Sequence, residues 1–324
     1  MKKAQHKILE AVGLYRNSRL TYSTFSKEHT FSTKLAYDTL TKPISVFSET
    51  GSCLVLANAW FRESGMYLSW GPLVGSVLLI AFSYVFFIMP FFVDIPWDVM
   101  GYFSVLFLCL LVLAAVYPLF FAARSEIKIQ GLKYTIFNSE SKNVHFVSDV
   151  DFEPKTCRWD ECTFCLAYSA GSIEGYYYEL KGYLFNEDGS VKDSFSFDDY
   201  HHMMSNSDAA RKEMTDDLYG RFEYVRRFME DGADSVEPVT PSLTLSPSLS
   251  EAAEYLYPGS RGETRLGFHI VYSLIRLVLL PFAGVQIVGH YFFCRYCRLP
   301  QWPQSVIDEC GEEVFPSREA ISPL

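Results

Sequence analysis

The sequence lacks the short motifs by which many enzymes bind nucleotides, activate a nucleophile or hold a catalytic zinc ion. It contains no Walker loop, G-x-S-x-G elbow, H-E-x-x-H helix or dinucleotide fingerprint. Basic charge is also scarce, with 28 Lys and Arg against 38 Asp and Glu and a formal net charge of −10. Nucleic-acid binding requires a basic surface. We therefore expect a protein that is not an enzyme, that needs no cofactor and that binds no nucleic acid.

Charge is missing altogether from two long stretches. Residues 64–93 and 99–123 contain no Asp, Glu, Lys or Arg. Each is longer than the roughly 20 residues that a helix needs to cross about 30 Å of hydrocarbon. The short connection between them holds Pro96 and Trp97, and the latter suits the membrane interface. The pattern predicts a transmembrane helical hairpin over residues 64–123, with Trp97 as a contact to the lipid bilayer.

The positive charges predict how this hairpin is oriented. Residues 1–66 carry nine Lys or Arg against five Asp or Glu, and Arg124 follows the second apolar stretch. The turn between the two stretches carries no basic residue. Basic residues favour the cytoplasmic side of a membrane. We therefore expect a cytoplasmic N-terminal segment over residues 1–63, in which the Ser- and Thr-rich residues 17–52 are loosely structured.

The region after the hairpin has the pattern of antiparallel strands. Residues 127–136 alternate apolar and polar side chains, residues 138–143 form a turn, and Val144 and Phe146 begin a return strand. A second hairpin is predicted around the turn at residues 186–189, which has the sequence Asn-Glu-Asp-Gly.

A helix is predicted to follow these strands and to end at Gly232. It begins near Ser207, where a polar side chain can cap the first turn. One apolar stripe runs along it at helical spacing and consists of Met214, Leu218, Phe222, Val225 and Met229. Core packing is the favoured role for this stripe. The layout of residues 124–232 is therefore an antiparallel β domain closed by an amphipathic helix, an element order like that of pleckstrin-homology domains.

The C-terminal part of the chain alternates polar and apolar segments. Residues 233–265 are rich in Pro and Ser and are predicted to be a linker. Residues 266–294 form a third apolar segment, interrupted by Arg276 and Pro281, and residues 295–324 are predicted to be a cytoplasmic tail.

Two structures are open to the third apolar segment. A single span would bury Arg276 in the bilayer and place the C-terminus outside. A hairpin bent at Pro281 would have two arms of roughly 20 Å, too short to cross. Basic residues flank both sides of the segment, so we favour a membrane-associated helical hairpin, in which Arg276 either reaches the headgroups or pairs with an acid of the cytoplasmic domain. The predicted fold class is thus an α+β membrane protein with a transmembrane hairpin, a cytoplasmic β domain and this C-terminal hairpin.

Two C-x-x-C pairs, Cys162/Cys165 and Cys294/Cys297, have the spacing of zinc ligands. In a strand, however, residues three apart point to opposite faces, which argues against the first pair. We expect partly buried free thiols and no metal site. Residues 198–202, with two adjacent histidines, are predicted to be a solvated turn.

Several segments together resemble a bacterial family of domains of unknown function, number 6708. The matching features are the apolar hairpin, the strand pair LKYTIFNSESKNVHFV, the helix ending YVRRFMEDG, the Pro-rich linker and the tail that begins with Trp302. The resemblance covers roughly residues 60–315.

The resemblance carries implications for function, because such proteins are frequently encoded beside type VI secretion toxins. It implies an immunity protein of the bacterial inner membrane that binds and neutralises a cognate toxin protein. The expected partner contacts are Arg276, Trp97 and Trp302. The acidic domain would complement a basic toxin surface, although solubility explains the same charge equally well. The alternative is a membrane-tethered, pleckstrin-like scaffold or sensor that binds lipid headgroups or a protein through its basic N-terminal region.

Overall fold

The computed structural model describes residues 40–58, 61, 65, 117, 121, 123–124, 126–172, 175–202, 208–245, 247–256 and 284–316. They divide into two compact units. The first unit comprises the described residues up to Phe61, Gly131–Leu245 and those from Leu299 onward, and the second comprises those within Arg62–Gln130 and Ser246–Arg298.

The first unit is built on two antiparallel sheets. The first sheet is a five-stranded meander of β1 (Val46–Thr50), β2 (Cys53–Ala57), β3 (Tyr134–Asn138), β4 (Asn143–Val147) and β5 (Pro154–Arg158). A short 3-10 helix, η5 (Trp159–Glu161), leads to the second sheet, which consists of β6 (Thr163–Ser172), β7 (Gly175–Phe185) and β8 (Val191–His202). The predicted hairpins at residues 138–143 and 186–189 are confirmed as the β3–β4 and β7–β8 connections.

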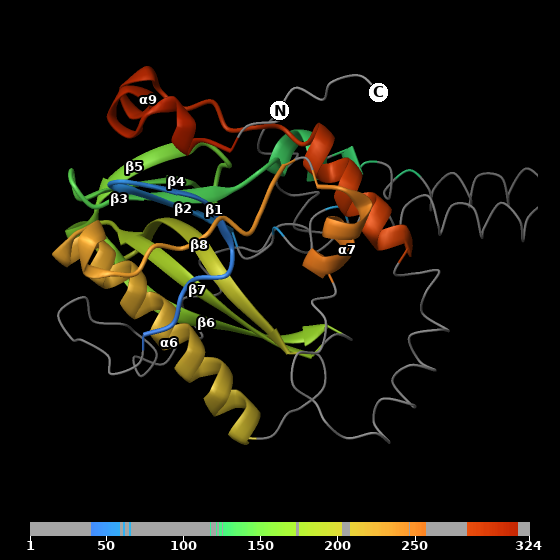
Figure 1. Ribbon diagram of the computed structural model, residues 1–324, viewed down its shortest axis with the longest axis horizontal. Helices are drawn as coiled ribbons and strands as arrows, with labels where there is room; N and C mark the ends of the chain where they lie inside the picture. The colour runs from blue at the N-terminus through green and yellow to red at the C-terminus, as the bar shows by residue number, and fades with distance from the viewer. Residues whose placement is uncertain are drawn as a thin grey trace, which may run out of the picture. The chain divides into compact units, whose positions relative to one another are not determined.

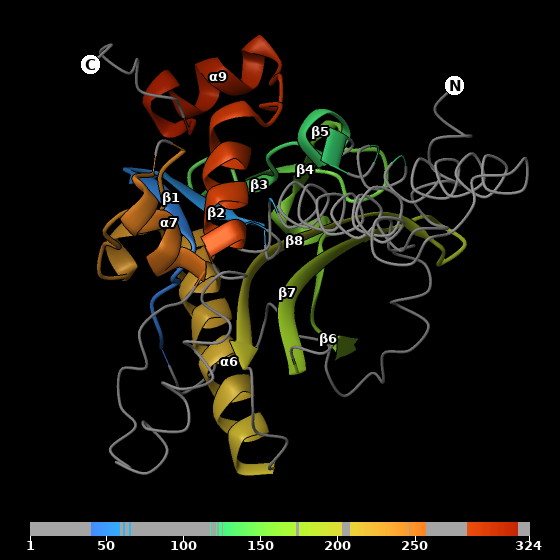
Figure 2. The same cartoon turned by 90° about the vertical axis from the view of Figure 1, so that its right-hand side faces the viewer.

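One long helix, α6 (Asp208–Asp231), closes the core between the sheets (Figures 1 and 2). Four members of the predicted stripe, Leu218, Phe222, Val225 and Met229, are fully buried in that core, which confirms their predicted role. Inward-facing side chains of both sheets meet them because alternate strand residues point to one face. The core is rich in aromatic rings, and the Phe146 and Phe195 rings stack at 4.4 Å.

A further layer covers the other face of the five-stranded sheet. It consists of α9 (Gln304–Cys310) and η7 (Glu312–Val314), which Figures 1 and 2 show on the side of this sheet opposite α6. The Ser48 hydroxyl donates to the carbonyl of Val314 at 2.7 Å. The C-terminal segment is therefore part of the β domain.

The segment predicted to be a linker also packs on this unit. After η6 (Ala233–Ser235), the amides of Ser242 and Leu243 donate to the carbonyl of Val46 at 2.9 and 3.0 Å. Leu243 and Leu245 are buried. Extended chain therefore follows the edge strand β1 and reduces the exposure of its unpaired backbone groups.

The second unit contains α7 (Leu249–Leu256), a helix over residues 284–296, and a π-helical turn, η4 (Glu126–Gln130). The Glu126 carboxylate accepts a hydrogen bond from the amide of Gly65 at 2.6 Å. Gly65 has φ +89° and lies so close to the backbone of Gly289 that no side chain fits there. A glycine is needed at this position for both reasons.

The structure corrects the predicted membrane fold class and inner-membrane location. Within the described ranges, no helix is both long and apolar enough to cross a bilayer. This finding contradicts the α+β membrane protein with two membrane hairpins. The stretches on which the prediction depended, residues 66–116 and 257–283, lie outside the described residues. The hairpin and single-span alternatives for residues 266–294 fall largely in the second of these stretches.

Three local predictions are wrong as well. Residues 46–50, expected to be loosely structured, form β1, because Val46 and its partner strand bury apolar side chains in the core. The alternation at Ile127 and Ile129 indicated a strand, but these residues lie in η4. Residues 198–202, expected to be a solvated turn, continue β8 as far as His202 through pairing with β7.

Gly182 in β7 makes room for an aromatic ring of the core. It pairs with Phe195 of β8, and a Cβ built on Gly182 would lie 2.6 Å from the Cε1 atom of that ring. We expect Gly182→Ala to lower the free energy of unfolding by about 1–3 kcal/mol, because the packed ring must move. Urea denaturation measures this loss. Gly284→Ala, where nothing lies within 4 Å of the new methyl group, is the control and should not destabilise. Equal losses in both variants would contradict the steric explanation.

Candidate functional site: an acidic patch around the β3–β4 turn

The β3–β4 turn at residues 139–142 is held rigidly by its own sequence. The Asn138 side chain accepts hydrogen bonds from the amides of Glu140 and Ser141 at 3.0 and 3.2 Å. This is the local bonding that favours Asn at turns. Lys142 takes a left-handed backbone conformation, with φ +60°. The turn therefore presents its side chains in fixed directions.

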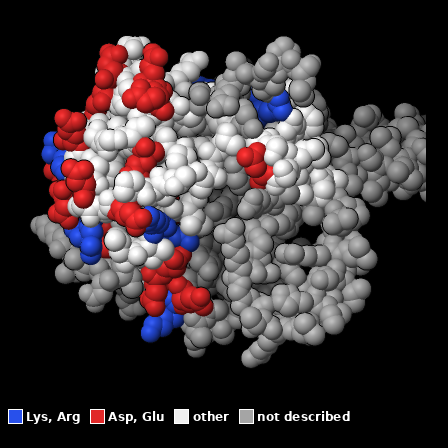
Figure 3. All heavy atoms as spheres, viewed as in Figure 1, with Lys and Arg blue, Asp and Glu red and all other residues white. Residues whose placement is uncertain are grey.

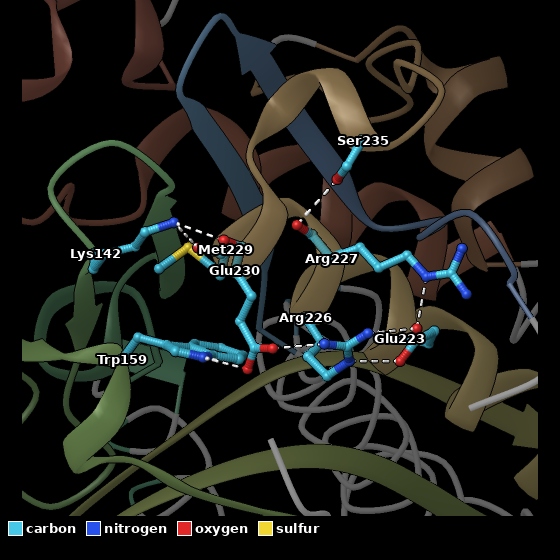
Figure 4. Close-up of polar contacts among 8 residues, drawn as sticks. All are labelled: Lys142, Trp159, Glu223, Arg226, Arg227, Met229, Glu230 and Ser235. Atoms are coloured by element: carbon cyan, nitrogen blue, oxygen red, sulfur yellow. Dashed lines mark hydrogen bonds and ion pairs between the residues drawn. The ribbon is translucent and has the colours of Figure 1, made fainter. Parts of the chain in front are cut away.

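Lys142 joins this turn to the C-terminal end of α6. Its Nζ donates to the carbonyls of Met229 and Glu230, the latter at 3.3 Å (Figure 4). Carbonyls in the last turn of a helix have no partner within the helix, and a cation is favourable there. Ser235 continues the cap, because its hydroxyl donates to the carbonyl of Arg227 at 3.1 Å.

Next to this cap, acidic and basic side chains of α6 form a hydrogen-bonded network. Glu223 is fully buried and accepts two hydrogen bonds from Arg226, at 2.7 and 2.8 Å, and one from Arg227 at 2.6 Å. Arg226 also donates to Glu230 at 2.6 Å, and the indole of Trp159 donates to the same carboxylate at 3.3 Å (Figure 4). Hydrogen bonding to Glu223, together with that to Glu230, outweighs burial and raises the pKa of Arg226 above its ordinary value. The end of α6 is thus fixed to η5 through Trp159.

On its other side, the turn is held by Glu309 of α9. One Glu309 oxygen accepts from the Ser141 hydroxyl and from the side-chain amides of Asn143 and Asn138, at 3.0 and 3.2 Å for the two amides. His145 lies 3.5 Å from the same oxygen. Burial alone would raise the pKa of Glu309, but these hydrogen bonds and His145 more than offset it and hold the pKa below its ordinary value. Glu309 is therefore ionised and links α9 to the turn through these hydrogen bonds.

These contacts bring together acidic residues that are far apart in the sequence. We call nine acidic residues at the surface the acidic patch: Glu140, Asp160, Glu161, Glu230, Asp231, Asp308, Glu309, Glu312 and Glu313. The side chains of Glu230 and Glu309 are partly covered, at 30% and 28% exposed. Figure 3 shows acidic side chains concentrated on the face that carries α9 and the end of α6. Two of the nine are paired with cations, because Asp160 lies 3.0 Å from Arg158 and Glu230 lies 2.6 Å from Arg226. Lys142 bonds the helix carbonyls. With the seven other carboxylates, the patch keeps a net negative charge on this framework.

Of the three predicted contact residues, the structure describes Trp302. Its indole donates to the hydroxyl of Tyr134 at 2.6 Å, and its ring lies 6.2 Å from that of Phe315. Burial raises the pKa of Tyr134 despite this hydrogen bond. Trp302 thus anchors the C-terminal layer to the sheet. Arg276 and Trp97 lie outside the described residues.

The cysteines that the structure describes do not form a recognisable metal centre. The seven described cysteines are free and buried. Across the part of the chain that the structure describes, no group of three or more His, Cys, Asp or Glu could hold a metal ion. Cys165 lies in a small cluster with Tyr183, apart from the main core that contains Cys162.

Sequence reasoning missed the residues that assemble the patch, above all Lys142 and Glu309. Each was visible only as part of a turn or of the tail. A usable signal was present, since short acidic pairs occur at residues 160–161, 230–231, 308–309 and 312–313. Nothing in the sequence indicated that these pairs are neighbours.

Comparison with known proteins places the chain in a family without assigning an activity. No curated protein and no solved structure matches it. A family profile, described as a family of unknown function (DUF6708), matches residues 133–314. The match runs from the start of β3 to η7, so it includes every residue of the acidic patch. Because it covers more than half of the sequence, this chain belongs to the DUF6708 family.

Proposed function

We propose that the protein is an immunity protein that binds a cognate secreted toxin through the acidic patch. The observation that supports this proposal is the nine acidic residues of the patch, which are held by contacts among the β3–β4 turn, η5, α6 and α9. Such a surface complements a basic protein surface and raises the rate of encounter by about 10- to 1,000-fold at low salt. The association of similar proteins with type VI secretion toxins suggests the class of partner.

Rigidity matters to this function because binding is weakened when side chains must be ordered at the interface. Trp159 and Lys142 hold the backbone beneath the patch through hydrogen bonds to the end of α6. The carboxylates are therefore displayed with little backbone entropy left to lose. The alternative of lipid-headgroup binding is less favoured, since the patch would repel anionic headgroups.

A rescue assay tests the proposal at the level of the cell. Deleting the gene should make cells sensitive to one toxin encoded beside it, and returning the intact gene should restore resistance. If the deleted strain stays as resistant as its parent to every neighbouring toxin, the proposal fails.

Neutralising part of the patch tests the surface itself. In the triple variant Glu140→Gln, Asp231→Asn and Glu312→Gln, we expect association with the purified toxin to slow by at least tenfold at low salt, because electrostatic steering is lost. Surface plasmon resonance at two salt concentrations measures the rate. The triple variant Glu187→Gln, Glu213→Gln and Asp216→Asn removes three exposed carboxylates outside the patch and serves as the control. Equal slowing in both would mean that net charge, and not this surface, matters.

A further inference from the structure

Two buried thiols lie side by side where the chain passes from one sheet to the other. Cys157 is in β5, the last strand of the five-stranded sheet, and Cys162 immediately precedes β6, the first strand of the other sheet. Their Sγ atoms are 3.2 Å apart, and the side chains are 6% and 7% exposed. A disulfide has an S–S distance of about 2.05 Å, so bond formation requires the sulfurs to approach by only about 1.1 Å.

The short connection between them is already closed by hydrogen bonds. The amide of Cys162 donates to the carbonyl of Trp159 at 3.2 Å. The amide of Arg158 donates to Glu161 at 3.3 Å, and the Arg158 guanidinium lies 3.0 Å from Asp160. Trp159 itself is buried against the Phe164 and Phe222 rings. The backbone therefore holds the two sulfurs together without help from a covalent bond.

We propose that Cys157 and Cys162 form a reversible intramolecular disulfide when the protein meets a peroxide. The bond would join the two sheets covalently at their corner and would close a ring of residues 157–162 that carries Trp159 and two members of the acidic patch. The proposal goes beyond toxin binding and stands without it.

The chemistry balances in two steps. The thiolate of one cysteine attacks hydrogen peroxide, the O–O bond breaks, and a sulfenic acid and hydroxide form. The second thiolate then attacks that sulfur, the S–O bond breaks, the S–S bond forms, and a second hydroxide leaves. In sum, the two thiols lose two electrons and two protons, and the peroxide is reduced to two molecules of water.

The surroundings make the reaction slow at neutral pH and faster in alkali. The hydrogen bond with Cys157, burial, and the charges of Glu161 and Asp160 all raise the pKa of the Cys162 thiol. Arg158, the nearby cation, is paired with Asp160. Because the thiolate is the nucleophile, we expect the rate of disulfide formation to rise steadily as the pH is raised from 7 to 9.

Peptide mapping of the full-length protein tests the proposal directly. After treatment with hydrogen peroxide and blocking of free thiols, trypsin cuts after Lys155 and after Arg158, between the two cysteines. The expected product is a reducible link between the peptides 156–158 and 159–181. Cys165 also lies in the second peptide, so Cys165→Ser must retain the link, whereas Cys162→Ser must abolish it. Burial raises the pKa of Cys165 to about 12, which makes this thiol a poor competitor.

Two results would overturn the proposal. One is a peroxide-treated protein in which the thiols of Cys157 and Cys162 still react fully with the thiol-blocking reagent. The other is a protein in which Cys53 and Cys310, whose thiols hydrogen bond to each other, are linked while Cys157 and Cys162 are not.

A supporting measurement of stability needs no variant. In urea, the oxidised protein should have an unfolding equilibrium constant roughly 10- to 40-fold smaller than the same sample after reduction, as the chain-entropy relation gives for a six-residue ring. An unchanged unfolding midpoint would show that the bond does not join the sheets as proposed.

Discussion

Replacing Arg221 with methionine should lower the free energy of unfolding by about 3–5 kcal/mol, since it removes one partner of a buried ion pair. Arg221 Nη1 donates to Asp198 Oδ1 at 3.1 Å, and the two side chains are 4% and 1% exposed. Methionine keeps the apolar stem and removes the guanidinium, so the Asp198 carboxylate loses its cation while it stays in the core. Chemical denaturation at pH 7 measures the loss.

The expected loss of stability is large because of the position of Asp198 in the fold. The β7–β8 register shifts between Glu179 and Leu180, which leaves Asp198 as the extra residue of a β-bulge with φ +54°. Bulges re-aim side chains, and Asp tolerates the left-handed conformation better than most residues. The amide of Ile44 donates to the same carboxylate at 3.4 Å. Asp198 therefore connects β8, α6 and the chain that enters β1.

A double-mutant cycle separates the ion pair from general damage. Asp198→Asn, which keeps the size of the side chain, is combined with Arg221→Met. We expect the double variant to lose less stability than the sum of the two single variants, because an uncharged amide is cheaper to leave unpaired than a carboxylate. Asp217→Asn, a partly exposed neighbour that also contacts Arg221, should cost no more than about 1 kcal/mol. A loss of under 1 kcal/mol in Arg221→Met would contradict the prediction.

The parts of the fold that could be predicted from the sequence are those whose signals are local. The turn at Asn138–Asn143 and the turn ending in Gly189 each carry their own bonding pattern. The stripe that contains Leu218 and Phe222 repeats at the helical period, which predicts a helix and favours core packing over a partner-binding face. Because the side chains of this stripe are apolar, their burial could be predicted as well.

The remaining parts depend on contacts between distant segments. β1 begins at Val46, and its outer edge is followed by Ser242, almost 200 residues later. The sequence predicts Trp302 as a partner contact and does not indicate that its indole bonds to Tyr134, 168 residues away. At Ile127 and Ile129, the alternation of apolar and polar residues covers too few positions to distinguish a strand from the π-helical turn η4.

The acidic patch shows the same limit at the level of function. The net charge predicted an acidic surface, and its bland explanation was solubility. The concentration of charge arises only because Lys142 reaches the end of α6 while Glu309 reaches Ser141. Five segments, the β3–β4 turn, η5, α6, α9 and η7, each carry one or two carboxylates and thereby become one surface. Such convergence is a tertiary property, and no spacing rule within a single sequence encodes it.

Truncating Phe222 to alanine is the second change with a large expected effect, a loss of about 3–5 kcal/mol in the free energy of unfolding. Phe222 is fully buried, and its ring lies 5.4 Å from that of Phe164 and 6.3 Å from that of Trp159. The cavity would therefore open where α6 meets η5, beneath the acidic patch. Phe222→Leu fills most of the space and should cost less than about 1.5 kcal/mol. Glu213→Ala on the exposed face of α6 should change stability by no more than about 0.5 kcal/mol. Urea denaturation followed by circular dichroism ranks the three variants, and a Phe222→Ala loss no larger than that of Phe222→Leu would mean that α6 does not close the core at this ring.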